Sequence, residues 1–186
     1  NVSVFETTIR VMGGLLSAHL MAVDEEIGIY ISTEQEESYD GHLLALAEDL
    51  GNRLLPAFQT NTGIPYGTVN LRYGVPRGET EIASTAGAGS LIVEFEVLSS
   101  LTGKRKFGDA AYGATRALFD RRSSIGLLGK HIHTDTGRWF ESVSGIGSNS
   151  DSFYEYLLKA YLLFRRKEMY GMFSDAYASI KKFVQV

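Results

Sequence analysis

Apolar side chains recur along this chain at two alternating kinds of helical spacing. In segments 4–23 and 151–164 they cover almost the whole circumference of a helix, which is typical of a helix buried on all sides. In segments 104–122 and 168–186 they keep to one face, which predicts an amphipathic helix at the periphery. An inner ring of helices surrounded by an outer ring would alternate in this way. We therefore predict an all-α fold of the α/α toroid type.

Two further segments show helical spacing. Segment 42–58 continues the pattern, and Pro56 is expected to bend or end that helix because proline removes a backbone donor. Segment 87–101 predicts another buried helix, and Gly103 supplies a glycine stop just after it. The acidic segment 24–40 is expected to be a surface insertion.

Glycine-rich stretches separate the helical pairs. Segment 60–86 predicts loops or a small hairpin outside the core, and segment 124–150 predicts a β-hairpin. Long loops of this kind are expected at the ends of the inner helices. No strict internal repeat is present.

Composition excludes several classes of protein. The chain has 186 residues, of which 44% are apolar and 22% charged, as in an ordinary globular domain. Its net charge of -4 and the absence of a long basic run argue against nucleic acid as a partner. No signal peptide or membrane-spanning run is visible, so membrane association is not evident. Because the chain enters a helix at once, we expect it to be part of a longer protein.

Two carboxylates open the apolar helix that begins at residue 151. Asp151 and Glu155 stand four residues apart, so they share one face about one turn from each other. Acidic side chains in the first turn of a helix are stabilised by the helix dipole, and Ser150 or Asp151 is placed to cap the helix. A capping box is therefore one interpretation of these residues.

Other acids lie on the predicted inner helices. Glu6 is in the first turn of the first helix with Arg10 four residues on, and Glu94 lies within the third. One interpretation is an internal ion pair and helix caps. The other is that several inner helices deliver carboxyl groups to one cavity, an arrangement suited to acid and base hydrolysis of a glycosidic bond.

Several stretches of this chain resemble the class I α-1,2-mannosidases of glycoside hydrolase family 47, in order from end to end. They are Phe5-Glu-Thr-Thr-Ile-Arg10, Gly13-Gly-Leu-Leu-Ser-Ala18, Arg53-Leu-Leu-Pro-Ala-Phe58, Gly63-Ile-Pro-Tyr66, Val69-Asn-Leu71 and Asp151-Ser-Phe-Tyr-Glu-Tyr-Leu-Leu-Lys159. The segment Thr85-Ala-Gly-Ala-Gly-Ser90 is similar to the branch of ER degradation-enhancing α-mannosidase-like proteins.

The resemblance implies a barrel of seven α/α hairpins, an inverting exo-mannosidase and a calcium ion (Ca2+) at the barrel floor. Glu6 matches the acid that donates a proton through a water, and Arg10 matches the arginine beside it. Asp151 matches the second catalytic carboxylate. Glu155 matches a glutamate in the sugar and calcium-water shell, so Arg10 and Glu155 are expected to bind substrate. Glu6 must stay protonated near neutral pH, which burial would favour and Arg10 would oppose.

This chain departs from the processing mannosidases at a few positions. Asn149 stands where they carry an arginine, and Gly87 stands where they carry an acid. The degradation-enhancing branch shares both changes, although Ser84 replaces a cysteine common there. The chain also stops before the family's proposed base and its calcium-ligating threonine. We therefore expect residues 1–186 to be part of a catalytic domain, without internal boundary, in which Glu155 reaches calcium only through water.

The implied function is the trimming of high-mannose N-glycans on misfolded glycoproteins in the endoplasmic reticulum lumen, for ER-associated degradation. A protein disulfide isomerase is a candidate partner. The alternative is a mannose-binding recognition module with weak or partner-dependent catalysis, and retention of Glu6, Arg10, Asp151 and Glu155 favours the enzyme. An α/α scaffold with structural ion pairs is the remaining interpretation.

Some residues suggest chemistry without completing a motif. His131 and His133 alternate on a predicted strand and face one side, yet no third metal ligand follows at suitable spacing. Trp139 and Phe140 suit either stacking on a sugar ring or a hairpin core.

Overall fold

The computed structural model describes residues 1–24, 26–27 and 39–185. Most of the predicted acidic insertion, 24–40, lies outside these residues. The helical segments are α1 (Val4–Glu6), the π-helix η1 (Thr7–Met12), α2 (Gly13–Val23), α3 (His42–Leu54), the 3-10 helix η2 (Leu55–Phe58), α4 (Thr85–Gly89), α5 (Ile92–Thr102), α6 (Lys106–Phe119), α7 (Asp151–Phe164) and α8 (Lys167–Phe183). The strands are β1 (Val2–Ser3), β2 (Thr68–Val69), β3 (Ile82–Ser84), β4 (His131–His133) and β5 (Trp139–Glu141).

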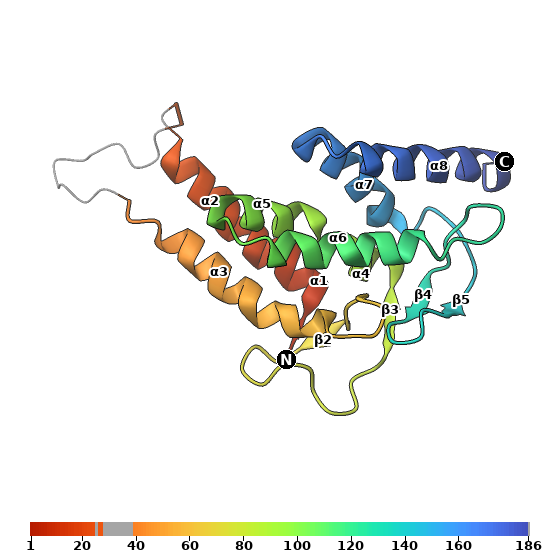
Figure 1. Ribbon diagram of the computed structural model, residues 1–186, viewed down its shortest axis with the longest axis horizontal. Coiled ribbons are helices and arrows are strands. Elements are labelled where there is room, and N and C mark those ends of the chain that lie inside the picture. The colour runs from red at the N-terminus through yellow and green to blue at the C-terminus, as the bar shows by residue number, and fades with distance from the viewer. Residues whose placement is uncertain (25, 28–38, 186) are drawn as a thin grey trace.

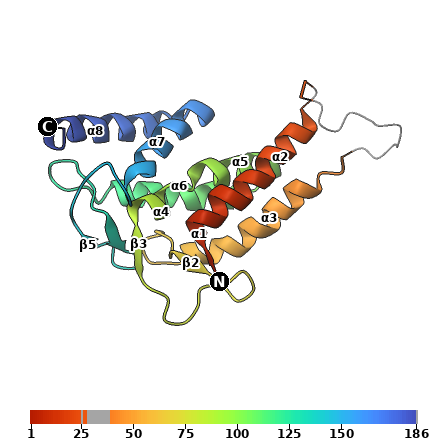
Figure 2. The ribbon, with the colours of Figure 1, turned by 180° about the vertical axis from the view of Figure 1, so that it is seen from behind.

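The helices form three antiparallel pairs in a row. Helix α2 packs on α3, α5 packs on α6, and α7 packs on α8. The first members of these pairs also contact one another, α2 with α5 and α5 with α7, as neighbouring inner helices do. Figures 1 and 2 show the pair α2–α3 and the pair α7–α8 at opposite ends of the row, with α5 and α6 between them. The predicted all-α architecture of paired inner and outer helices is confirmed.

The core lies between the paired helices. Phe95, Phe107 and Phe153 are fully buried there, and the Phe95 ring meets the rings of Phe58 and Phe107 edge-on. Glycine allows the closest approach in this core. A Cβ on Gly89 of α4 would stand 2.3 Å from Cδ2 of Phe153, so only glycine lets α7 pack this tightly.

Helices α2 and α7 are not buried all round, although their composition had suggested that they would be. Leu20 on α2 and Leu162 and Leu163 on α7 are exposed, together with Val11 in η1. Helix α5, by contrast, contacts α2, α3, α6 and α7, and Ser100 is its one exposed residue. No helix in that part of the chain combines the length and apolar character needed to span a membrane.

Two small antiparallel sheets lie at one end of the helices. Strand β1 pairs with β2 through Val2 and Val69, and β3, β4 and β5 form a three-stranded sheet in that order. Figure 1 shows the strands gathered on the side where α1 begins. The hairpin predicted at 124–150 is confirmed in β4 and β5.

The prediction that segment 60–86 stays outside the core is wrong. Ile64 and Val69 are fully buried, and Ala83 is nearly so. The strands of this segment do not pair with each other as a local hairpin. Each pairs with a distant strand, β2 with β1 and β3 with β4, and these pairings carry apolar side chains into the core.

Candidate functional site

Three inner helical stretches begin at the sheet-bearing end of the molecule, with α1, α4 and α7, and their first turns meet there. A Cβ on Gly87 of α4 would lie 3.9 Å from the Cβ of Phe5 on α1. On its other side, the backbone N–H of Ala86 donates a 2.8 Å hydrogen bond to the carbonyl oxygen of Asn149, just before α7. Helix α4 therefore lies between the two helices that carry the predicted catalytic acids.

Glu6 stands where α1 passes into the π-helix η1. The hydroxyl oxygen of Ser3 accepts the backbone N–H of Glu6 at 3.3 Å and so caps the start of the helix. Arg10 Nε donates a hydrogen bond to Glu6 Oε2 across one turn. A π-helical turn is rare and occurs frequently at functional sites, and no pattern in this sequence signals it.

Glu6 lines a hollow of about 220 Å3, called here the Glu6 hollow. Phe5, Pro65, Tyr66 and Gly87 are among its other walls. The Glu6 side chain is about half exposed, at 48%, and the Arg10 side chain is exposed at 73%. The described residues thus place Arg10 beside the Glu6 carboxyl and leave both side chains open to solvent. Tyr66 also lines this hollow, although neither helical spacing nor the family resemblance assigns it a role.

Asp151 is the first residue of α7, and its side chain is exposed. Its Oδ1 accepts the backbone N–H of Ser152 at 2.9 Å. Asp151 lines a second hollow of about 230 Å3, whose walls include Tyr154, Phe173 and Tyr177. Glu155 follows one turn later and is also exposed. The structure joins Glu6 with Arg10 and places Asp151 and Glu155 on one helix. Glu6 and Asp151 line different hollows.

Ser150 does not cap α7, although one form of the capping interpretation had predicted that it would. Ser150 precedes the helix, but its side chain makes no capping hydrogen bond. The buried Ser150 hydroxyl instead donates to the carbonyl oxygens of Gly145 and Gly147, at 2.9 and 3.1 Å, and closes the preceding loop. Ser150 and the Asp151 carboxylate therefore do not form a joint cap at the start of α7.

Two of the departures from the processing mannosidases have a structural reason. A Cβ at Gly87 would stand 2.8 Å from Oγ of Ser84, which accepts the Gly87 N–H at 3.0 Å and caps α4. An acid at position 87 would therefore displace this cap. Asn149 has a φ of 74°, in the left-handed region that asparagine tolerates better than arginine does.

Glu94 is set apart from these exposed acids. Its carboxyl group lies between α5 and α7, where Tyr156 donates to it, and it lines neither the Glu6 hollow nor the Asp151 hollow. Burial raises the pKa of this carboxyl. Hydrogen bonds from its own backbone and from Tyr156 lower the pKa, but the effect of burial is larger. The expectation that Glu94 joins the other acids in one cavity is not met.

The two strand histidines are each paired with a carboxylate. His131 Nδ1 lies 2.7 Å from Glu141 Oε2, and His133 Nε2 lies 2.9 Å from Glu81 Oε2. Within residues 1–24, 26–27 and 39–185, no group of three or more histidine, cysteine, aspartate or glutamate side chains is placed to hold a metal ion. These histidines instead link the strands and loops of the three-stranded sheet.

The two aromatic residues of β5 differ in their surroundings. Trp139 is half-buried, and its indole N–H donates to the carbonyl oxygen of Arg121 at 2.8 Å, so it belongs to the hairpin core. Phe140 is exposed. The hairpin-core interpretation therefore fits Trp139 alone.

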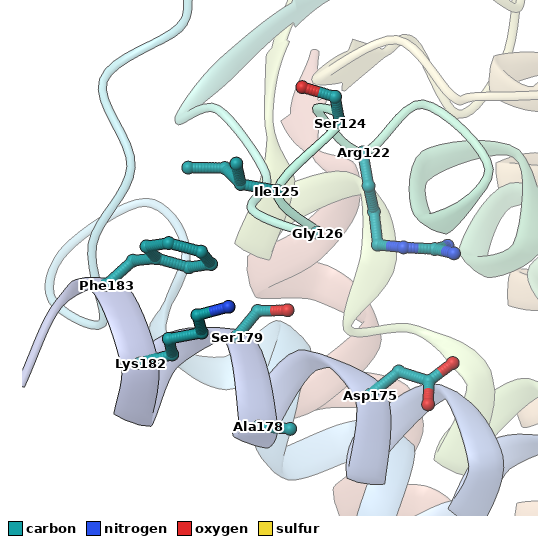
Figure 3. A pocket seen from close by; sticks show the side chains of 9 residues that line it. All are labelled: Arg122, Ser124, Ile125, Gly126, Asp175, Ala178, Ser179, Lys182 and Phe183. Atoms are coloured by element: carbon teal, nitrogen blue, oxygen red, sulfur yellow. The ribbon is translucent and has the colours of Figure 1, made fainter.

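A third hollow, of about 590 Å3, contains none of the predicted site residues. It lies between α8 and the loop after α6, where Ile125 and Phe183 face each other with Lys182 beside them (Figure 3). It has no carboxyl pair of the kind that a glycosidase needs, since Asp175 is its one acidic lining residue.

Comparison with known proteins gives a consistent class. The profile of glycosyl hydrolase family 47 matches residues 1–186. The chain is 54% identical over 98% of its length to alpha-mannosidase I MNS4 of Arabidopsis thaliana, covering 28% of that protein. It is 48% identical over its whole length to ER degradation-enhancing alpha-mannosidase-like protein 2 of Homo sapiens, covering 31% of that protein. The solved alpha-1,2-mannosidase from Trichoderma reesei matches with a TM-score of 0.79 and 32% identity, over 97% of this chain and 37% of that one.

The paired inner and outer helices are thus those of an α/α-barrel glycosidase. The chain belongs to glycosyl hydrolase family 47, and its relatives include the ER degradation-enhancing alpha-mannosidase-like proteins. It spans about a third of the length of these relatives or less.

Proposed function

We propose that the protein to which this chain belongs is an inverting α-1,2-mannosidase that trims high-mannose N-glycans on misfolded glycoproteins for ER-associated degradation. One observation carries the proposal: the first turns of three inner helices meet, and the outer two of these turns bear Glu6 and Asp151. We further propose that residues 1–186 form part of one catalytic domain without an internal boundary.

The proposed reaction uses two separated carboxyl groups with different roles. An inverting glycosidase uses one carboxylic acid to protonate the leaving oxygen and a carboxylate to activate water on the opposite face of the sugar. Glu6 is the proposed proton donor, acting through a water, and Asp151 is the second catalytic carboxylate. Arg10 and Glu155 are the proposed substrate-binding residues. Arg10 Nε donates a hydrogen bond to the Glu6 carboxyl, and Glu6 lines the Glu6 hollow.

Calcium is proposed as a requirement of the full-length protein. Glu155 alone does not form a site, and the described residues hold no group of three metal ligands. The residues present therefore do not fit a directly bound ion, and Glu155 is proposed to contact calcium only through water. The catalytic steps proposed for Glu6 and Asp151 do not depend on the calcium ion.

The proposed setting is the lumen of the endoplasmic reticulum. The human relative is named as an ER degradation-enhancing alpha-mannosidase-like protein, and the same name recurs for a relative from Schizosaccharomyces pombe. The partners proposed with this setting are high-mannose glycans on glycoprotein clients and a protein disulfide isomerase.

Incubation of the full-length protein with a high-mannose N-glycan and calcium tests the proposal. We expect free mannose, released first as the β-anomer when followed by proton NMR, because inversion converts the α-linkage. Release of the α-anomer would contradict the inverting mechanism. Glycan binding without any release would contradict the hydrolase and favour the recognition module.

A further inference from the structure

One asparagine of this chain begins a tripeptide of the kind that accepts an N-linked sugar, called a sequon. Asn1-Val2-Ser3 has a serine two positions after the asparagine and no proline between them. No other asparagine in the sequence has serine or threonine two positions on. Because so short a motif also arises by chance, its use depends on how the fold presents Asn1.

Asn1 lies just before β1 and outside the core. Its side chain is exposed, whereas Val2 is half-buried and pairs with Val69 of β2. The same antiparallel register places Asn1 opposite Asn70. Figures 1 and 2 show this end of the chain beside β2. A bulky group on the Asn1 side chain can therefore extend into solvent without displacing buried side chains.

The two polar atoms of the Asn1 amide have different surroundings. Asn1 Oδ1 accepts a 3.0 Å hydrogen bond from Nδ2 of Asn70. Asn1 Nδ2 makes no hydrogen bond with any described residue. An N-linked sugar is attached to this nitrogen, and the amide oxygen stays an acceptor after the attachment. The modified side chain thus keeps its hydrogen bond with Asn70.

Exposure alone does not single out Asn1. Asn61 is also exposed and is followed directly by Thr62, but no hydroxyl residue stands two positions on. Its Nδ2 also donates to Oδ2 of Asp135 at 2.8 Å, so a sugar on this nitrogen would lie against the aspartate. Asn1 differs from Asn61 in both the sequon and the open nitrogen. Asn61 is therefore a matched comparison within the same chain.

The sequon is engaged once the chain has folded. The Ser3 hydroxyl oxygen accepts the backbone N–H of Glu6, and the backbone of Val2 and Ser3 is paired with β2. An enzyme that binds this tripeptide in its own cleft finds it free only before β1 pairs. The sugar must therefore be added to the unfolded chain, and the fold must then accommodate it, as the exposed Asn1 side chain does.

We propose that Asn1 is an N-glycosylation site. The inference rests on the proposed function for its setting alone, because the sugar donor, an oligosaccharide joined to a lipid by a diphosphate, is used in the lumen of the endoplasmic reticulum. Nδ2 of Asn1 forms a bond to the anomeric carbon of the first N-acetylglucosamine, and the bond from that carbon to the diphosphate breaks. The lipid diphosphate leaves with the bonding electrons, and water takes up one Nδ2 proton.

Mass spectrometry of the full-length protein from a eukaryotic cell tests the site. The protein is digested to peptides with its sugars in place, and fragment spectra show which asparagine carries N-acetylglucosamine. We expect a glycan on the peptide that contains Asn1 and none on the peptide that contains Asn61. Ser3→Ala should abolish the modification. Ser3→Thr should keep it, because threonine also completes the sequon and retains the hydroxyl that caps α1.

Protease protection of the protein in intact microsomes reports the setting separately. Unmodified Asn1 in protected protein would overturn the site and leave the proposed lumenal setting in place. Protein open to the protease would contradict the setting and the modification together. A glycan that persists on Asn1 in Ser3→Ala, or that appears on Asn61, would contradict the assignment to the sequon. Failure of the proposed hydrolase is distinct, since it would show as absent mannose release whether or not Asn1 is modified.

Discussion

The phenol of Tyr156 on α7 donates a 3.0 Å hydrogen bond to Oε1 of Glu94 on α5. The second oxygen of this carboxyl, Oε2, is buried and has no hydrogen-bond partner within the described part of the chain. Burial raises the pKa of the Tyr156 hydroxyl, and the nearby Glu94 carboxylate raises it further. The hydroxyl therefore stays protonated and can donate at physiological pH. The pair ties the helix bearing Asp151 and Glu155 to the centre of the row of helices.

Removing the Tyr156 hydroxyl should weaken this connection. In Tyr156→Phe the buried Glu94 carboxyl loses the donor to Oε1, and leaving a buried polar group unpaired costs about 1–3 kcal/mol. We expect the free energy of unfolding of the full-length protein, measured by urea titration, to fall by that amount. Tyr170→Phe, at an exposed ring, is the control and should change it by less than about 0.5 kcal/mol. Equal effects would contradict the buried pair.

Glu94 should make stability depend on pH. Because burial raises the pKa of its carboxyl, the folded protein holds this proton more tightly than the unfolded chain does. The resulting stabilisation is complete below the unfolded pKa of about 4.3, and it is lost as the pH rises through the raised folded pKa. We expect Glu94→Gln to remove this loss in urea midpoints recorded from about pH 4 to pH 8. A variant that follows the parent at every pH would refute the assignment.

Gly89 should tolerate no side chain. A Cβ there would stand 2.3 Å from Cδ2 of Phe153 and 2.9 Å from Cδ1 of Leu118, so Gly89→Ala must displace these side chains or α4 itself. Overpacking of this kind costs about 1–3 kcal/mol. Gly113→Ala on α6 is the control, since a Cβ there has nothing within 4 Å and alanine favours a helix by about 1 kcal/mol. The thermal midpoints of the two variants should therefore move in opposite directions.

The residue at position 149 should be restricted by its backbone. Asn149 has a φ of 74°, and the left-handed conformation costs most other residues about 1–2 kcal/mol. We expect Asn149→Ala to lower the free energy of unfolding by about this amount, and Asn149→Gly to lower it little because glycine accepts positive φ. If alanine and glycine gave the same stability, the left-handed geometry before Asp151 would be ruled out.

The helical architecture could be predicted because its signals are local. The one-faced spacing on segments 104–122 and 168–186 corresponds to α6 and α8, each with one buried face. Gly103 has a φ of 70°, in agreement with the predicted glycine stop after α5. These features depend on residues a few positions apart, which a sequence pattern displays directly.

Features that depend on distant contacts could not be predicted in this way. Strand β1 finds its partner around Val69, and no periodicity near Val2 announces that pairing. The Tyr156 and Glu94 side chains meet across 62 positions of sequence. The spacing of Glu6 and Arg10 fits an ordinary α-helix, so it gave no warning of the π-helix η1.

The catalytic and substrate-binding roles of the site residues stay predictions. The pairs Glu6–Arg10 and Asp151–Glu155 follow from helical spacing, and the structure keeps both. Their assignment to hydrolysis depends on family resemblance, because spacing alone equally allowed caps and ion pairs. The exposure of Glu6 could not be foreseen either, since it depends on which helices pack beside α1.

Mannose release by carboxylate variants of the full-length protein tests the central claim most directly. With calcium and a high-mannose glycan, Glu6→Gln and Asp151→Asn are each expected to lower the rate at least about 100-fold, the scale of a lost acid or base. Asp49→Asn is the matched control, because Asp49 is also exposed and is paired with an arginine four residues on. Parental rates in Asp49→Asn with loss in the other two would support the assignment. Parental rates in Glu6→Gln or Asp151→Asn would contradict it.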